Sequence, residues 1–188
     1  DFHMSKNKFS THDLCIIALF TALTAVMSQI SIPLPFGPVP FTLQTFAIYL
    51  CAIILGSRLG TISQIIYVLL GAIGIPVFAS FSGGLQCILG PTGGFIIAFP
   101  IVTFIVGKIT SKNKSTILTF IELTFTLIFL YTMGIAQLCF ITKMPLLKAI
   151  MVGAVPFIPL DIVKIIMAYI IGAKIKNSLL TSNLLKKC

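Results

Sequence analysis

The stretch Pro156-Phe-Ile-Pro-Leu-Asp161-Ile-Val-Lys164-Ile-Ile-Met-Ala168 places two opposite charges inside an apolar run. On membrane insertion scales, an Asp or a Lys at the middle of a helix costs about 2.5–3.5 kcal/mol. Because the two residues are three positions apart, they share one face of a helix and can pair there. A chain that keeps both charges must gain something from them, in structure or in binding.

The composition of the chain is that of a membrane protein. Of its 188 residues, 57% are hydrophobic and only 9% are charged, whereas soluble chains have roughly 25% charged residues. The mean hydropathy is +1.12. The apolar runs are continuous and lack the alternating pattern of a transmembrane β-barrel. We therefore predict an all-α integral membrane protein.

Six apolar segments approach the length of about 20 residues that a bilayer requires. They are residues 14–30, 41–55, 61–79, 95–109, 117–141 and 147–173. They predict six transmembrane helices in a single membrane domain, with a bundle over residues 14–173 and polar tails at 1–12 and 174–188. Within the third segment, Gly74-Ile-Pro76 is a place where a helix can break.

The basic residues predict the orientation of the bundle. With the N-terminus inside, the cytoplasmic segments contain Lys6, Lys8, Arg58, Lys108, Lys112, Lys114, Lys174, Lys176, Lys186 and Lys187. The opposite face has only Lys143 and Lys148. By the positive-inside rule, both termini are cytoplasmic. The net charge of +9 thus reflects membrane topology, and nucleic acid is not expected as a partner.

Two segments that this topology places outside carry no charge. Residues 31–40 and 80–94 are rich in Pro and Gly; proline fixes φ, and glycine lets the backbone approach a ligand closely. Uncharged polar side chains are expected on the same side, at Thr42, Gln44, Ser82, Gln86 and Thr92. We expect these segments to line one external cavity together with the Asp161–Lys164 pair.

Three roles remain open for the charged pair. In a binding role, Lys164 attracts an anionic group of a ligand and Asp161 accepts hydrogen bonds from its N–H groups. In a structural role, the pair locks two helices together. In a third role, Asp161 is a proton site of a carrier.

The sequence offers no residues for catalysis, for a metal site or for ATP. Both histidines, His3 and His12, lie in the N-terminal tail. The segment Leu89-Gly-Pro-Thr-Gly-Gly94 lacks the lysine and the Ser or Thr that end a phosphate-binding loop. We therefore expect a protein that is not an enzyme and that has no cofactor of its own.

The first apolar segment has small residues at Ala18, Ala22 and Ala25. Small residues four apart allow another helix to approach closely. This face either packs within the protein or docks a partner subunit.

Several motifs together resemble the BioY family, the biotin-specific substrate-binding (S) components of energy-coupling-factor (ECF) transporters. The resemblance covers nearly the whole hydrophobic chain. Its motifs are IPLPFGPVPFTLQT (32–45), GIPVF (74–78), GG (83–84), LGPTGGF (89–95) and PLDIVK (159–164). It implies an S-component-like helical bundle in a prokaryotic cell membrane, with biotin bound near the outer face.

The resemblance also implies roles for individual residues. Asp161 and Lys164 correspond to the Asp and Lys of the family's last helix, and Gly93 and Gly94 belong to its glycine-rich loop. With Gln44, Ser82 and Thr92, they form the expected substrate-binding set.

Ala18 and Ala22 match the small-residue face by which S components dock. The implied partners are a transmembrane coupling protein and two cytoplasmic ATPase subunits, so that ATP acts only through the partners. The expected function is high-affinity biotin binding in a biotin importer. The alternatives are a solitary or proton-coupled vitamin carrier and a structural membrane protein.

Overall fold

The computed structural model describes residues 9–112, 115–182 and 184. Its helices are α1 (Thr11–Gln29), α2 (Gln44–Ala72), α3 (Leu85–Leu89), α4 (Gly93–Thr110), α5 (Thr116–Thr142), α6 (Leu146–Gly153) and α7 (Ile158–Thr181). Two short antiparallel strands, β1 (Ser31–Ile32) and β2 (Phe41–Thr42), and a 3-10 turn, η1 (Ala79–Phe81), complete the described part. Of the basic residues used to predict the orientation, Lys6, Lys8, Lys114, Lys186 and Lys187 lie outside the described residues.

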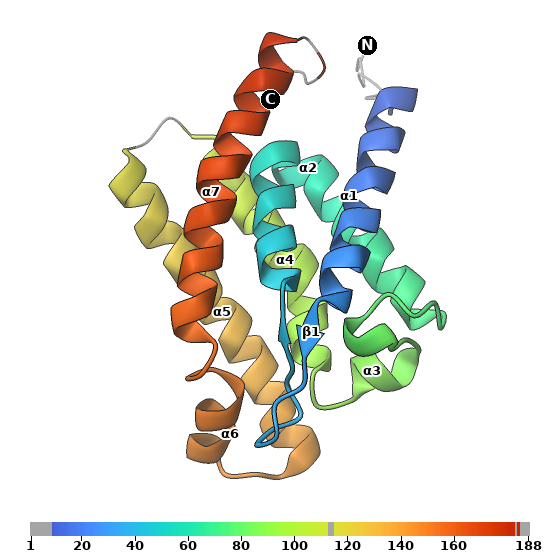
Figure 1. Ribbon diagram of the computed structural model, residues 1–188, viewed down its shortest axis with the longest axis vertical. Helices are drawn as coiled ribbons and strands as arrows, with labels where there is room; N and C mark the ends of the chain where they lie inside the picture. The colour runs from blue at the N-terminus through green and yellow to red at the C-terminus, as the bar shows by residue number, and fades with distance from the viewer. Residues whose placement is uncertain (1–8, 113–114, 183, 185–188) are drawn as a thin grey trace, which may run out of the picture.

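Several helices can cross a membrane, as predicted. Among the described residues, α1, α2, α4 and α5 are long and apolar enough, and the bent pair of α6 and α7 raises the number to up to five. The predicted segments 41–55 and 61–79 fall largely on the two halves of α2, which Gly56 interrupts with φ 75° and ψ −173°. Figure 1 shows the chain changing direction within α2. Because α2 ends at Ala72, the predicted break at Gly74 lies just beyond the helix.

The sixth predicted segment, 147–173, is not one continuous helix. α6 ends at Gly153, α7 begins at Ile158, and the two are bent by 48°. The reason is Pro156, which lacks an amide hydrogen and disfavours the helical conformation at the residue before it. Pro159 lies in the first turn of α7, where a missing amide hydrogen is tolerated. α7 also extends to Thr181, past the predicted start of the C-terminal tail.

The core of the protein forms around the first half of α2. Residues 47–55 are all buried, and α2 packs against α1, α4 and α7. Large apolar side chains are exposed on the outer faces of other helices, among them Phe125, Ile128 and Ile166. This distribution suits a protein whose exterior contacts lipid chains.

The loops that matter for function gather at one end of the molecule. The start of α1 and the end of α7 lie at the same end, whereas α3, α6 and the loop between β1 and β2 lie toward the other (Figure 1). The two charge-free segments of the sequence are therefore close in space. They enclose the site described next.

Candidate functional site

A cavity of about 360 Å³ lies beneath the charge-free segments, within the range of about 300–1,000 Å³ that is typical of ligand pockets. Its walls come from residues 33–40, which we call the Pro-rich loop, from residues 78–82, which we call the pocket loop, and from α4, α5 and α7. The predicted polar residues that line it are Thr42, Gln44, Ser82, Thr92, Asp161 and Lys164. The fold thus brings together predicted polar side chains from four separate parts of the chain.

The charged pair is formed in the first two turns of α7 and is buried. Lys164 Nζ donates to Asp161 Oδ1 at 2.7 Å, and the side chains are only 8% and 7% exposed. Lys164 Nζ also donates to the carbonyl oxygen of Thr42 at 2.6 Å and lies 4.0 Å from the ring centroid of Phe41. The hydroxyl of Tyr131 in α5 donates to Asp161 Oδ2 at 2.6 Å. The pair therefore joins α7 to both β2 and α5.

The pair retains hydrogen-bonding capacity for a ligand. An ammonium has three N–H donors and a carboxylate about four acceptor positions. Lys164 uses donors toward Asp161 and Thr42, and Asp161 accepts from Lys164 and Tyr131. Buried charges are tolerated when they are paired, so a ligand can add bonds without meeting an uncompensated charge. The site suits a molecule with N–H donors next to an oxygen acceptor.

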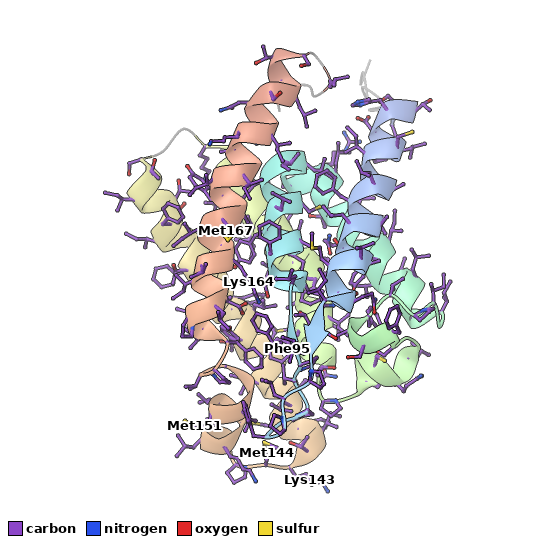
Figure 2. The ribbon with its side chains drawn as sticks, in the orientation of Figure 1. Phe95, Lys143, Met144, Met151, Lys164 and Met167 are labelled. Carbon is purple, nitrogen blue, oxygen red and sulfur yellow. The ribbon has the colours of Figure 1, made fainter. Side chains whose placement is uncertain are left out.

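Figure 2 shows Lys164 in the middle of the bundle and Phe95 nearer the end formed by the loops. Both residues line the cavity. Further apolar walls come from Phe78, Phe99 and Phe157. A ligand here would meet both polar side chains and apolar walls that include several aromatic rings.

Gln44 is fixed by a network of its own. Its Nε2 donates to the hydroxyl of Tyr67 at 2.8 Å, and its Oε1 accepts from the hydroxyl of Thr42 at 3.0 Å. The Tyr67 hydroxyl in turn donates to the carbonyl oxygen of Val77, at 2.9 Å. Gln44 is therefore held in one orientation at the cavity wall, next to the residue that binds Lys164.

The glycines of the GPTGG segment (residues 90–94) lie elsewhere. Gly93 and Gly94 are buried and are not among the residues that line the cavity. A Cβ atom at Gly93 would collide with the carbonyl oxygen of Ile88, and one at Gly94 with that of Met133 in α5. Close packing of this segment against both α3 and α5 explains why both are glycine, and within the segment only Thr92 reaches the cavity wall.

Ala18 and Ala22 are exposed on the surface of α1. A different face of α1 packs on α2, where the hydroxyls of Thr21 and Ser63 lie 3.1 Å apart and Gln64 donates to Thr24 at 3.0 Å. The two alanines are thus available to another helix.

Sequence reasoning missed Tyr131 and Phe41, which contact the charged pair, and the aromatic cavity walls formed by Phe78, Phe99 and Phe157. Tyr131 lies in an apolar run and looks like any aromatic residue that packs or faces lipid. Phe41 stands at the start of the predicted apolar segment 41–55. The only available signal was proximity in space to Asp161 and Lys164, which the sequence does not contain.

Comparisons with known proteins agree with this architecture. The BioY family model matches residues 4–181. The "Probable biotin transporter BioY" of Pyrococcus horikoshii is 46% identical over 166 residues, which are 88% of this chain and 97% of that protein. The "Biotin transporter BioY" of Thermotoga maritima is 43% identical over 159 residues, 85% of this chain and 92% of that protein.

The fold also matches a solved structure, the crystal structure of the S-component for biotin from an ECF-type ABC transporter. The TM-score is 0.82 at 29% identity, and the match covers 90% of this chain and 95% of that chain. These similarities point to a transport protein rather than an enzyme. They show that the chain belongs to the BioY family.

Proposed function

We propose that this protein is the high-affinity biotin-binding membrane subunit of a biotin importer. The observation that carries the proposal is the buried Asp161–Lys164 pair, which faces a cavity of about 360 Å³ and keeps free bonding capacity. The named relatives and the S-component with the same fold supply the choice of biotin. The pair alone would suit other ligands with an anionic tail and a neutral polar head.

The chemistry of biotin is complementary to the cavity. Its ureido ring carries N–H donors and a carbonyl acceptor, and its tail ends in a carboxylate. In our proposal Asp161 accepts from a ureido N–H, Lys164 donates to a ligand oxygen, and the rings of Phe78 and Phe99 contact the apolar bicycle. The polar side chains of Gln44, Ser82 and Thr92, which also line the cavity, complete the substrate-binding set.

The proposed topology has six spans and cytoplasmic termini. The two halves of α2 count as separate spans, and α6 with α7 counts as one. This arrangement puts the cavity at the outer face of a prokaryotic plasma membrane, where it captures biotin. It is supported by the Pro-rich loop, which lines the cavity and lies away from the end where α1 begins and α7 ends (Figure 1).

Delivery inward is proposed to need an energising module, made of a transmembrane coupling protein and two cytoplasmic ATPase subunits. The exposed residues Ala18 and Ala22 are the proposed docking face. A proton-coupled carrier that acts alone is the competing function, with Asp161 as its proton site.

Equilibrium binding of labelled biotin to the purified protein tests the proposal. Lys164→Ala and Asp161→Ala should each weaken binding more than tenfold, a change above about 1.4 kcal/mol. Lys148→Ala, which changes an exposed lysine of α6, should leave binding unchanged. The double variant Asp161→Asn with Lys164→Met removes both charges at similar volume and should fold without binding. If this variant binds like the wild type, the pair is structural only.

Uptake into vesicles separates the subunit from the solitary carrier. Biotin should accumulate only when the ATPase module and ATP are present. Changing Ala18 and Ala22 together to Leu should leave binding intact and impair this uptake, because the larger side chains keep a partner helix at a distance. Accumulation driven by a pH gradient without the module would favour the carrier.

A further inference from the structure

The pocket loop (residues 78–82) has an unusual backbone. Ser80 and Phe81 have φ values of 57° and 54°, so that two consecutive residues with side chains are left-handed. This region is sterically unfavourable for residues other than glycine, and it persists where the surroundings enforce it. Because Ser80 and its neighbour Ala79 line the cavity, whatever holds this backbone also shapes the ligand site.

Bonds within the loop close the turn but do not account for all of its polar groups. The amide of Phe78 donates to the carbonyl oxygen of Ser82 at 3.0 Å, and the amide of Ser82 donates to that of Ala79 at 3.3 Å. The amide of Phe81 and the carbonyl oxygen of Phe78 take part in bonds to a residue outside the loop. That residue is Gln29, at the end of α1.

The side-chain amide of Gln29 bridges the two sides of the turn. Its Oε1 accepts from the amide of Phe81 at 2.8 Å, and its Nε2 donates to the carbonyl oxygen of Phe78 at 3.1 Å. The two hydrogen bonds join residues that are 49 and 52 positions apart in the sequence. A single side chain thus satisfies one donor and one acceptor of the strained loop.

Residues at the end of α1 and the start of β1 support this contact. The Ser28 hydroxyl donates to the carbonyl oxygen of Val77 at 2.6 Å, and the Ser31 and Ser80 hydroxyls lie 2.9 Å apart. The Val77 carbonyl also accepts from Tyr67, whose hydroxyl binds Gln44 at the cavity wall. The end of α1 is therefore connected through the pocket loop to the residues around the ligand.

We propose that Gln29 is a positioning residue for ligand capture: its amide holds the pocket loop in its left-handed conformation at the cavity and thereby slows the release of the ligand. This role of Gln29 rests on the proposed function, because it takes the ligand to be biotin. Gln29 itself does not line the cavity. It acts through the loop.

The test compares Gln29→Leu with Gln86→Leu in the purified full chain. Gln86, which was also expected on the cavity side, is an exposed glutamine near the same loop that does not line the cavity, and its side chain donates to Gly83 within its own segment. In Gln29→Leu the dissociation rate of biotin should rise about tenfold, as expected when hydrogen bonds to a strained loop are lost. Hydrogen exchange at residues 78–82 should also become faster in the ligand-free protein. Gln86→Leu should change neither quantity.

A second variant distinguishes positioning from general destabilisation. Phe81 is 72% exposed, and asparagine tolerates the left-handed region better than phenylalanine does. Adding Phe81→Asn to Gln29→Leu should therefore restore slow dissociation of biotin. A general loss of stability would not be rescued in this way, and failure of the rescue would overturn the positioning role.

The exchange measurement also separates this proposal from the proposed function. If the wild type does not bind biotin, the proposed function fails. Faster exchange at residues 78–82 in Gln29→Leu would still show that Gln29 holds the pocket loop. If hydrogen exchange at residues 78–82 and biotin dissociation are both unchanged in Gln29→Leu, the positioning role of Gln29 is excluded, whatever the ligand is.

Discussion

The Pro-rich loop (residues 33–40) and the GPTGG segment (residues 90–94) have similar compositions but different tasks. Both lack charge and are rich in Pro and Gly. Most of the Pro-rich loop lines the cavity, whereas Thr92 alone does so in the GPTGG segment. There the glycines let the segment pack against α5, and Gln137 of α5 donates to the carbonyl oxygens of Ile88 and Gly90 at 2.7 and 2.8 Å. A missing Cβ marks a close approach, but it does not tell whether a ligand or a helix approaches.

The largest effect that tests this difference is expected for Gly93→Ala. The added Cβ would collide with the backbone oxygen of Ile88, which cannot move away as a flexible side chain could. Overpacking of this kind costs about 1–3 kcal/mol or more, so the thermal midpoint and the yield of folded protein should fall. Thermal unfolding in detergent measures the change.

The matched control is Gly37→Ala in the Pro-rich loop, where the added Cβ would lie 3.1 Å from the Cβ of Val152. This contact is tight but much less close than the one at Gly93, so the loss of stability should be smaller. The comparison breaks down if Gly93→Ala keeps full stability and loses biotin binding, because Gly93 would then belong to the ligand site.

A medium effect is expected for Gln137→Leu. The variant removes the hydrogen bonds to Ile88 and Gly90, each with a net contribution of about 0.5–1.5 kcal/mol. The free energy of unfolding should decrease by about 1–3 kcal/mol, and biotin affinity should change little. Gln86→Leu, at an exposed site, should leave stability nearly unchanged. Equal losses in the two variants would show that Gln137 has no special role in holding the GPTGG segment.

The smallest effect on stability is expected for Pro38→Gly. Pro38 lines the cavity and is exposed. Loss of the fixed φ makes the unfolded chain more flexible and costs about 0.4–1 kcal/mol. Biotin affinity should fall a few-fold, because a flexible loop must be ordered on binding. Titration calorimetry measures the affinity, and an unchanged value would remove the Pro-rich loop from the binding surface.

The sequence predicted much of this fold because membrane burial leaves a strong signal. Long apolar runs located the helices, and the cost of charge in lipid singled out Asp161 and Lys164. The absence of charge pointed to the two segments that meet at the cavity. The break between α6 and α7 was missed although Pro156 signals it, because the run of apolar residues continues through it.

Other features depend on contacts between distant residues. The hydrogen bond from Tyr131 to Asp161 joins positions 30 apart, and the contact from Lys164 to Thr42 joins positions 122 apart. The packing roles of Gly93 and Gly94 depend on how closely α3 and α5 approach them. No local pattern of residue types specifies these distances, so the structure was needed to assign them.

The most direct test of the central claim is a structure of the protein with biotin bound. The account predicts biotin inside the cavity, with Asp161 or Lys164 within hydrogen-bond distance of its polar groups, about 2.7–3.2 Å, and the Pro-rich loop against the ligand. The GPTGG glycines should remain packed on α5, out of contact with biotin. Biotin bound elsewhere, with the Asp161–Lys164 pair unchanged and its cavity empty, would contradict the account.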